Sequence, residues 1–381
     1  MTETPLHFKT ILELASMIES KTLSPVEVTE SALTRIGQQD PQYKSYATVM
    51  AEQARTSAKA AEQAIASGNY LGPLHGVPIA VKDLCFTKGV PTMGATKALK
   101  THVPDFDCTV VQKLNDAGAV ILGKLNLTEG AMAGYNPEFQ VPVNPWGPHL
   151  WSGASSSGSG VATAAGLCYG SLGSDTGGSI RFPSAACGIV GLKPTWGRVS
   201  RYGVLALAES LDHIGPMVRS SADAGIMLQA ISGLDPNDPT SLPDPVPDML
   251  RDIEKGVQGL RIGLDDKYIS ENTDPELVAS VLAGIKTLEG LGATIVPVTM
   301  PDLSGYMEAW GVLCSSEALA AHESTYPSHR DDYGPWFQGW LDNGAQVTGA
   351  EYAKANNVRS ACRGLLHNIF QEVDIICCPA M

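Results

Sequence analysis

Apolar runs that predict strands alternate along this chain with stretches that carry helix signals. Ser24 is followed by proline and then, three residues on, by glutamate, which indicates a helix that runs to about Gly37. Residues 48–67 are rich in Ala, Glu and Gln and precede a glycine, so they predict a second helix. Residues 110–118 predict a helix and residues 119–122 a buried strand. Such alternation indicates an α/β fold with a mixed, mostly parallel, twisted β-sheet flanked by helices on both sides.

The later part of the chain continues this pattern beyond an irregular segment. Residues 234–248 contain five prolines and four acidic residues, so we expect an exposed Pro/Asp-rich connector there. Beyond it, residues 260–264 predict a strand, 274–291 an amphipathic helix and 293–298 another strand. Residues 373–381 predict a core strand that runs into a proline.

Composition and charge narrow the class of function. The chain has 381 residues, 44% of them hydrophobic, which is enough for a large core. A formal net charge of −14 without a basic stripe argues against a nucleic-acid partner. The polar N-terminus and the lack of a long apolar window predict no secretion signal and no membrane span. The eight cysteines lack CxxC or metal-binding spacing, which predicts no metal site and a cytoplasmic protein.

The stretch GSDTGGSIR, from Gly173 to Arg181, is the strongest candidate for chemistry. It places the hydroxyl of Ser179 directly after two glycines, whose backbone freedom lets neighbouring N–H groups turn toward one point. A hydroxyl beside converging N–H donors suits acyl transfer, which needs a nucleophile and a site for the oxyanion. A Gly/Ser-rich loop without chemistry explains the same letters equally well.

Two other segments bear on this choice. Residues 153–160 form a serine-dense turn that precedes the apolar, Ala-rich run 161–167, so we expect a helix whose N-terminal N–H groups face the turn. Residues 76–83 are mostly apolar and strand-like, with Lys82 near the end. Most lysines lie in solvent, but five uncharged residues precede this one, which favours partial burial.

In this order and spacing, the segment 72–83, the serine-dense turn and residues 173–183 resemble the amidase signature family of serine hydrolases. The likeness continues through residues 187–200 and 212–216. It is dense over roughly residues 8–235 and thins beyond them. The resemblance implies a single-domain amidase signature fold over residues 1–381.

The resemblance also implies roles for individual residues. It implies a Ser-cisSer-Lys triad with Ser179 as nucleophile, Ser155 as bridging serine and Lys82 as base, and no cofactor. The implied oxyanion hole consists of the backbone N–H groups of Thr176, Gly177, Gly178 and Ser179, and the implied supporting residues are Asp175, Arg181 and Ser156. The scattered histidines are poor candidates for the base, since His75 and His213 lie in Gly/Pro-flanked turns without a paired nucleophile.

The lysine of such a triad must be neutral to accept a proton. A free lysine has a pKa of about 10.4, so a shift of roughly three units, or about 4 kcal/mol, is needed, which burial can supply. This chain departs from the family before the bridging serine, where Ser152-Gly153-Ala154 replaces the usual Pro-Gly-Gly. We interpret this difference, with Trp151, as a local variation that shapes specificity.

The substrate is less well defined than the class of reaction. Met132, Tyr135, Trp151 and Phe182 are candidates for the substrate pocket, although ordinary core packing explains them as well. The family acts on fatty, aryl, peptide-terminal and small amides, carbamates and urea derivatives. We therefore expect a small-molecule amide substrate of unspecified type, and leave a homodimer open.

Two other functions fit parts of the sequence. Residues 72–78 and 197–203 look much like the amidase component of glutamyl-tRNA amidotransferase, which releases ammonia from glutamine within a complex; Trp196 and the altered serine turn argue against it. A non-enzymatic binding protein on the same scaffold is disfavoured by the presence of Lys82, Ser155 and Ser179 together.

The C-terminal residues raise a separate expectation. Family members continue well past the strand equivalent to residues 373–378. A strand left at a sheet edge is normally covered. We therefore expect a further C-terminal segment, or a partner, to complete the sheet.

Overall fold

The computed structural model describes residues 4–380. Their contacts group into two compact units. The first contains residues up to 250 together with 317–342, and the second contains 251–316 together with the residues from 343 onward. Within the described residues, no helix is long and apolar enough to cross a membrane.

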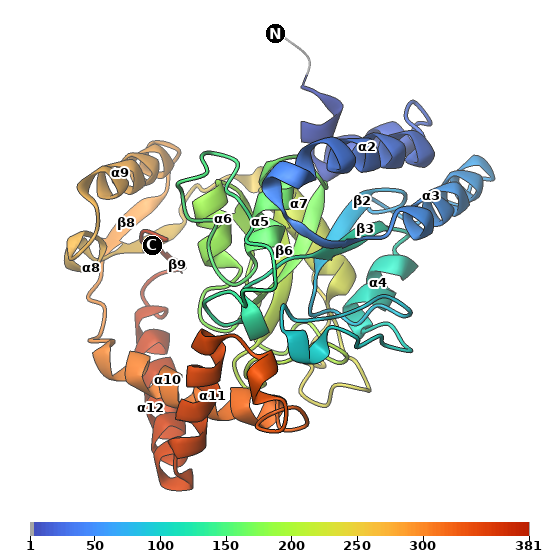
Figure 1. Ribbon diagram of the computed structural model, residues 1–381. Helices are drawn as coiled ribbons and strands as arrows, with labels where there is room; N and C mark the ends of the chain where they lie inside the picture. The colour runs from blue at the N-terminus through green and yellow to red at the C-terminus, as the bar shows by residue number, and fades with distance from the viewer. Residues whose placement is uncertain (1–3, 381) are drawn as a thin grey trace. The chain divides into compact units, whose positions relative to one another are not determined.

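A mixed six-stranded sheet forms the centre of the first unit (Figure 1). Its strand order is β1-β3-β2-β4-β6-β5, and β2 runs parallel to both β3 and β4, whereas the other neighbours are antiparallel. The strands are β1 (Tyr46–Val49), β2 (Pro78–Lys82), β3 (Val120–Leu125), β4 (Gly170–Asp175), β5 (Val190–Gly191) and β6 (His213–Val218).

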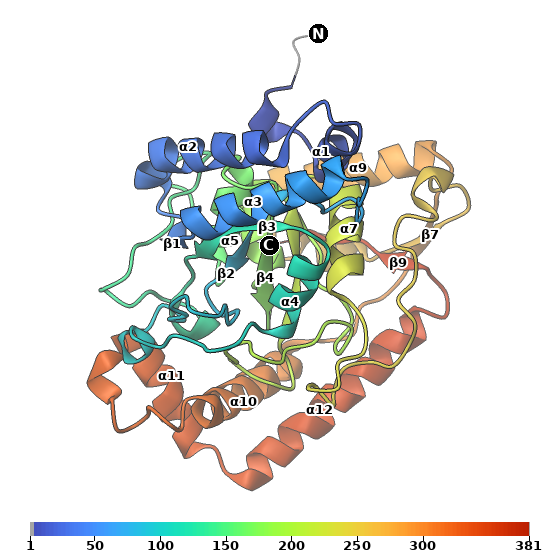
Figure 2. The ribbon, with the colours of Figure 1, turned by 90° about the vertical axis from the view of Figure 1, so that its right-hand side faces the viewer.

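Helices cover both faces of this sheet. Ile79 and Val81 of β2 pack in one cluster with α1, α4 and α7, whereas Ala80 packs in a second cluster with α2, α3 and α5. Side chains alternate between the faces of a strand, so both faces are buried. Figure 2 shows α2 and α3 alongside one another. The helices are α1 (Ile11–Glu19), α2 (Pro25–Tyr43), α3 (Ala51–Ala66), α4 (Thr109–Asp116), α5 (Ser157–Ala164), α6 (Arg181–Cys187), α7 (Ser221–Ile231) and α11 (Pro335–Gln346), with short 3-10 turns η1 (Leu6–Phe8), η2 (Lys97–Leu99), η3 (Glu129–Ala131) and η5 (Arg330–Asp332).

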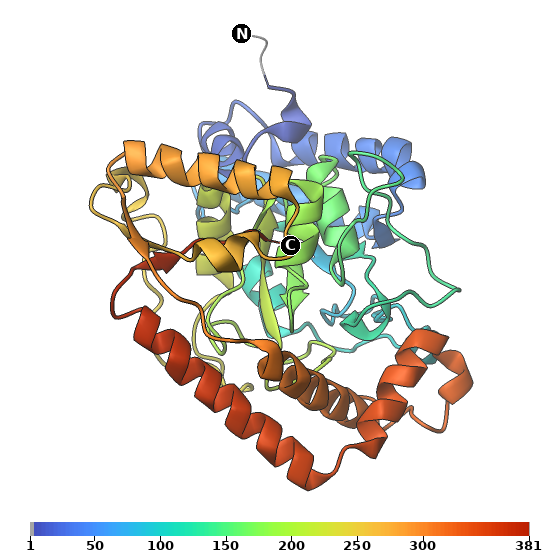
Figure 3. The same cartoon turned by 90° about the vertical axis from the view of Figure 1, so that its left-hand side faces the viewer.

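The second unit contains a parallel three-stranded sheet in the order β8-β7-β9 (Figure 3). Its elements are η4 (Ile253–Lys255), β7 (Arg261–Leu264), α8 (Asp266–Ser270), α9 (Pro275–Gly290), β8 (Thr294–Pro297), α12 (Gly349–Ile369) and β9 (Ile375–Ile376), and α10 (Ser304–Ala321) begins in this unit. The strands and the helix predicted between residues 260 and 298 are confirmed. The predicted core strand at residues 373–381 is wrong in extent, because β9 is two residues long, lies at the edge and leaves Ile375 38% exposed.

The predicted α/β class, with a mixed sheet flanked by helices, is confirmed. Parallel pairing joins four strand pairs over the two sheets and antiparallel pairing joins three. The helix predicted to end near Gly37 continues to Tyr43, whose partly buried side chain packs against the cluster that contains Leu33 and Ile36. Residues 234–248 form no helix or strand and are mostly exposed.

Candidate active site

The end of β2 carries Lys82 into the interior of the first unit. β2 lies between β3 and β4 and is parallel to both, so the carboxyl ends of the three strands meet at one edge of the sheet. Lys82 is the last residue of β2 and is 1% exposed. Lys82 is therefore more deeply buried than the sequence predicted.

Three serine hydroxyls surround the Lys82 amine. Its Nζ donates to Ser155 Oγ at 2.7 Å, to Ser156 Oγ at 2.9 Å and to Ser174 Oγ at 2.8 Å. All three serines are buried. Ser155 and Ser156 belong to the serine-dense turn and Ser174 to β4. The Lys82 amine therefore connects the serine-dense turn with the strand that leads to Ser179.

Burial lowers the pKa of Lys82 to about 7, against the opposing charges of Asp212, Cys85 and Asp175. A substantial fraction of the amine is therefore neutral at neutral pH. A neutral amine has two N–H donors and one lone pair, so one of the three hydroxyls must then donate to Nζ. The Ser156 hydroxyl already donates to the Ser174 carbonyl at 3.2 Å, which leaves Ser155 and Ser174 for that role.

The serine-dense turn is fixed by close backbone packing. The Ala154–Ser155 peptide bond is cis. Gly153 has φ +77°, and a Cβ there would lie 2.2 Å from Pro183 Cα, so only glycine fits. α5 then begins at Ser157, within the serine-dense turn and before the apolar run 161–167.

Ser179 lies on the loop between β4 and α6 and is partly exposed. The Ser156 N–H donates to the Ser179 carbonyl at 3.3 Å, which ties this loop to the serine-dense turn. Within residues 4–380 the Ser179 hydroxyl has no hydrogen-bond partner. The structure thus brings Ser155 to Lys82, but the expected contact between the Ser155 and Ser179 hydroxyls is not made in this conformation.

Asp175 organises the loop that carries Ser179. Its carboxylate accepts from the Gly178 N–H at 2.8 Å, from the Ile180 N–H at 3.2 Å, and from Arg181 Nε at 3.0 Å and Nη2 at 2.9 Å. Burial raises the pKa of Asp175, but the Arg181 hydrogen bonds and charge, with the backbone donors, lower it by more, so the net direction is downward. Asp175 and Arg181 thus contact this loop and each other, and their supporting role stays a prediction.

One predicted oxyanion donor needs correction. The Gly178 N–H is not available to an oxyanion in this conformation, because it is bonded to Asp175. Among the described residues, the N–H groups of Gly177 and Ser179 have no acceptor. The Thr176 hydroxyl donates to Asp212 Oδ1 at 2.6 Å. Gly178 is still required as glycine, since its φ is +136° and a Cβ would lie 2.2 Å from the Phe182 ring.

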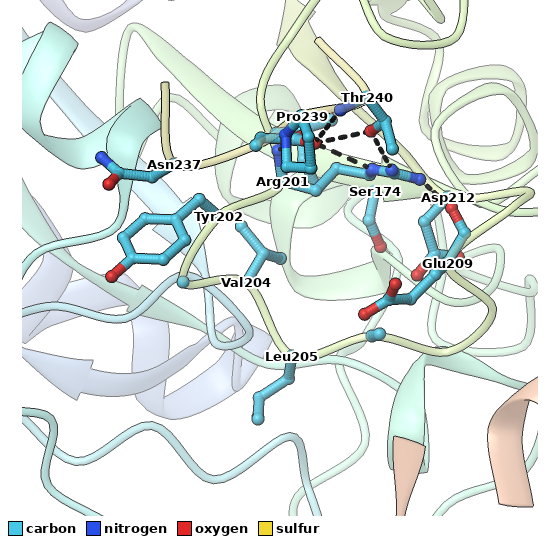
Figure 4. Close-up of a pocket in the computed structure, with 14 residues that line it drawn as sticks. Ser174, Arg201, Tyr202, Val204, Leu205, Glu209, Asp212, Asn237, Pro239 and Thr240 are labelled. Carbon is cyan, nitrogen blue, oxygen red and sulfur yellow. Dashed lines mark hydrogen bonds and ion pairs between the residues drawn. The ribbon is translucent and has the colours of Figure 1, made fainter. Parts of the chain in front are cut away.

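A cavity of about 280 Å³ reaches the lysine cluster from one side, and Figure 4 shows Ser174 and Asp212 together in its wall. The residues that line it are Ser174, Arg201, Tyr202, Gly203, Val204, Leu205, Ala206, Glu209, Asp212, Ile214, Asn237, Asp238, Pro239 and Thr240. None of the expected pocket residues Met132, Tyr135, Trp151 and Phe182 lines this cavity. Tyr135 instead donates its hydroxyl to Ser157 Oγ at 2.9 Å, and Trp151 is 51% exposed.

Sequence reasoning missed three features of the site. Ser174 and Asp212 stood inside the quoted motifs, but no spacing rule marks them as neighbours of Lys82 or Thr176. The third is the fully buried ion pair between Lys124 and Asp83, 3.0 Å apart. The position of Asp83 directly after Lys82 could have signalled it.

The histidines play no part in the cluster. His75 Nδ1 accepts from the Leu71 N–H at 3.1 Å, and His213 Nδ1 pairs with the Asp175 carbonyl at 3.0 Å. Both are structural contacts, as expected.

Comparison with known proteins identifies the family of this chain. The Amidase family model matches residues 27–381. The putative amidase AmiD of Mycobacterium tuberculosis is 46% identical over 370 residues, covering 97% of this chain and 78% of that protein. The chain belongs to the amidase signature family. As a member of the amidase signature family it is an amide-hydrolysing enzyme.

Two further relatives show the breadth of the amidase signature family. The A-type subunit of the glutamyl-tRNA(Gln) amidotransferase of Thermosynechococcus vestitus is 39% identical over 395 residues, covering 97% of this chain and 82% of that protein. The solved peptide amidase of Stenotrophomonas maltophilia is 30% identical, with a TM-score of 0.84, over 93% of this chain and 79% of that one.

Proposed function

We propose that this enzyme hydrolyses its amide substrate through an acyl-enzyme on Ser179, with Lys82 as the base and Ser155 as the proton relay. The observation that carries the proposal is the buried Lys82 amine, 2.7 Å from Ser155 Oγ and with a pKa lowered to about 7. A buried amine that is partly neutral at neutral pH can accept a proton, whereas a solvated lysine cannot.

Acylation begins when Ser179 Oγ attacks the amide carbonyl carbon. The Ser179 proton passes to Ser155 Oγ as the Ser155 proton passes to the Lys82 amine, so one net proton reaches Nζ. Rotation of the partly exposed Ser179 side chain toward Ser155 completes this path. The carbonyl oxygen becomes an oxyanion, which the N–H groups of Gly177 and Ser179 stabilise, at about 3–4 kcal/mol for each essential donor.

The leaving amine takes the proton back by the same path. Lys82 returns it to Ser155, and Ser155 delivers a proton to the nitrogen as the C–N bond breaks. Water then attacks the Ser179 ester, giving its proton to the relay, and release of the acid restores the Ser179 hydroxyl. Every proton is accounted for by residues of this chain, and no cofactor enters a step.

A second candidate is the release of ammonia from glutamine, in the role of the amidase component of glutamyl-tRNA amidotransferase. The 39% identity to such a component over 97% of this chain favours it. The chemistry at Ser179 is the same, but it would predict glutaminase activity and binding of companion subunits.

A fluorophosphonate probe tests the proposal, because it reacts with activated serines. We expect Ser179 of the purified protein to be labelled and Ser179→Ala to abolish labelling. Ser184→Ala is the matched control: Ser184 is buried in the adjacent α6, and its Oγ has no hydrogen-bond partner among the described atoms. Labelling that survives Ser179→Ala would contradict the proposal. Turnover of glutamine, an aryl amide and a carbamate ester then separates the two candidates.

A further inference from the structure

Asp212 lies at the point where β6 begins, opposite the end of β4. The antiparallel pairing of these strands places Ser174 across from Ile214 and Asp175 across from His213. Asp212, one residue before β6, therefore faces the start of the loop that carries Ser179. It is buried, and it shares the wall of the cavity with Ser174, whose Oγ accepts from Lys82 (Figure 4).

The Asp212 carboxylate uses both oxygens. Oδ1 accepts from the Thr176 hydroxyl at 2.6 Å, and Oδ2 accepts from the N–H groups of Leu207 at 2.9 Å and Ala208 at 3.1 Å. Thr176 immediately precedes the Gly177 to Ser179 segment. The carboxylate thus holds this segment to the turn before β6.

We propose that Asp212 is a positioning residue, which ties Thr176 to β6 and sets a negative charge against the Lys82 amine. The inference rests on the proposed role of Lys82 as the base. It goes beyond that role by assigning the control of this base to a residue that directly precedes another strand, β6.

The charges around the amine single out Asp212. Burial lowers the pKa of Lys82, and the charges that raise it are, in order of size, those of Asp212, Cys85 and Asp175. Asp175 is bonded to the Arg181 guanidinium, which offsets its charge. The hydrogen-bond donors to Asp212 are a hydroxyl and backbone N–H groups, all neutral, and Arg201 acts on it only through space.

The direction of the effect follows from these charges. An ionised Asp212 stabilises the Lys82 ammonium and so raises the pKa of Lys82, whereas a neutral side chain at position 212 lets it fall further. Burial raises the pKa of Asp212 itself to about 6, so it is mostly ionised at neutral pH.

Asp212→Asn tests the inference, since asparagine keeps an oxygen for Thr176 but removes the charge. We expect the acid limb of the Ser179 labelling rate, plotted against pH, to move to lower pH by on the order of 0.5–1 unit. Asp235→Asn is the matched control. Asp235 is another buried carboxylate that accepts from two hydroxyls, those of Thr109 at 2.5 Å and Ser200 at 2.6 Å, but it is not among the groups that act on Lys82. Its substitution is expected to leave the limb in place.

Thr176→Val removes the hydrogen bond to Asp212 from the threonine side, and it replaces Asp212→Asn as the test if that variant does not fold. We expect Thr176→Val to slow labelling. Combined with Asp212→Ala, it should label no more slowly than the slower of these two single variants, because each of them removes the same hydrogen bond. An unmoved acid limb in Asp212→Asn, an equal shift in Asp235→Asn, or additive losses in the double variant would overturn the inference. Absence of labelling in the unsubstituted protein would instead remove the proposed function.

Discussion

At the scale of single residues, the site depends on an amine held out of water. Lys82 is almost fully buried, yet its hydrogen-bond partners are neutral hydroxyls rather than carboxylates. Lys124 is equally buried but has a different kind of partner, because its Nζ forms an ion pair with the Asp83 carboxylate at 3.0 Å. Hydroxyl partners bring no negative charge to hold the proton on Lys82, so burial lowers the pKa of this lysine to about 7.

This difference predicts a pH-dependent stability. Folding lowers the pKa of Lys82 from 10.5 to about 7, so between these values the folded state binds fewer protons than the unfolded chain. The contribution of Lys82 to stability therefore rises with pH across that window, by up to about 1.4 kcal/mol per pH unit, and is lost below it.

Lys82→Met isolates this contribution, since it keeps the side-chain length without the amine. We expect the free energy of unfolding of the unsubstituted protein, measured in urea and taken relative to Lys82→Met, to increase from pH 7 to pH 9 by about 2 kcal/mol. A difference that stays constant with pH would mean that Lys82 is charged in the folded protein.

At the scale of elements, a glycine in a loop and a glycine in a helix have different roles. Gly153 has φ +77° and packs its Cα against Pro183, whereas Gly37 lies inside α2 with open space where a Cβ would stand. Gly153 allows the serine-dense turn to pack against α6, whereas Gly37 only lowers the intrinsic helix propensity of α2.

Alanine substitution is expected to separate these two roles. Gly153→Ala should destabilise the fold by several kcal/mol and abolish labelling of Ser179, because the backbone must shift to clear Pro183. Gly37→Ala should stabilise by roughly 0.5–1 kcal/mol, the propensity difference between the two residues in a helix. Thermal unfolding measures both, and an unchanged transition in Gly153→Ala would show that the turn adapts to a Cβ.

The elements also show what the sequence could and could not predict. Periodicity and turn chemistry were sufficient for α3, α4, α9 and the strands β2, β7 and β8, since these depend on local patterns. The Asp212–Thr176 contact was out of reach, because it depends on the antiparallel pairing of β4 with β6, which no local pattern encodes. The commitment of the Gly178 N–H to Asp175 was missed for the same reason: the geometry of the loop decides which N–H groups turn inward.

At the scale of the whole molecule, family membership and the geometry of the cluster point to the same chemistry. The match over residues 27–381 makes the chain an amidase signature enzyme, and the buried lysine among serines is the group that we propose as its base. The likeness alone does not decide the substrate, because a peptide amidase and an amidotransferase component both resemble this chain.

The pH dependence of Ser179 labelling by a fluorophosphonate tests the role of Lys82 most directly. We expect the rate to rise with pH through about 7, as the Lys82 amine loses its proton, and to level off above it. In Lys82→Met we expect the rate to fall by at least about 100-fold and this inflection to disappear. A rate that is flat through neutral pH, or an inflection that survives in Lys82→Met, would contradict the assignment of Lys82 as the base.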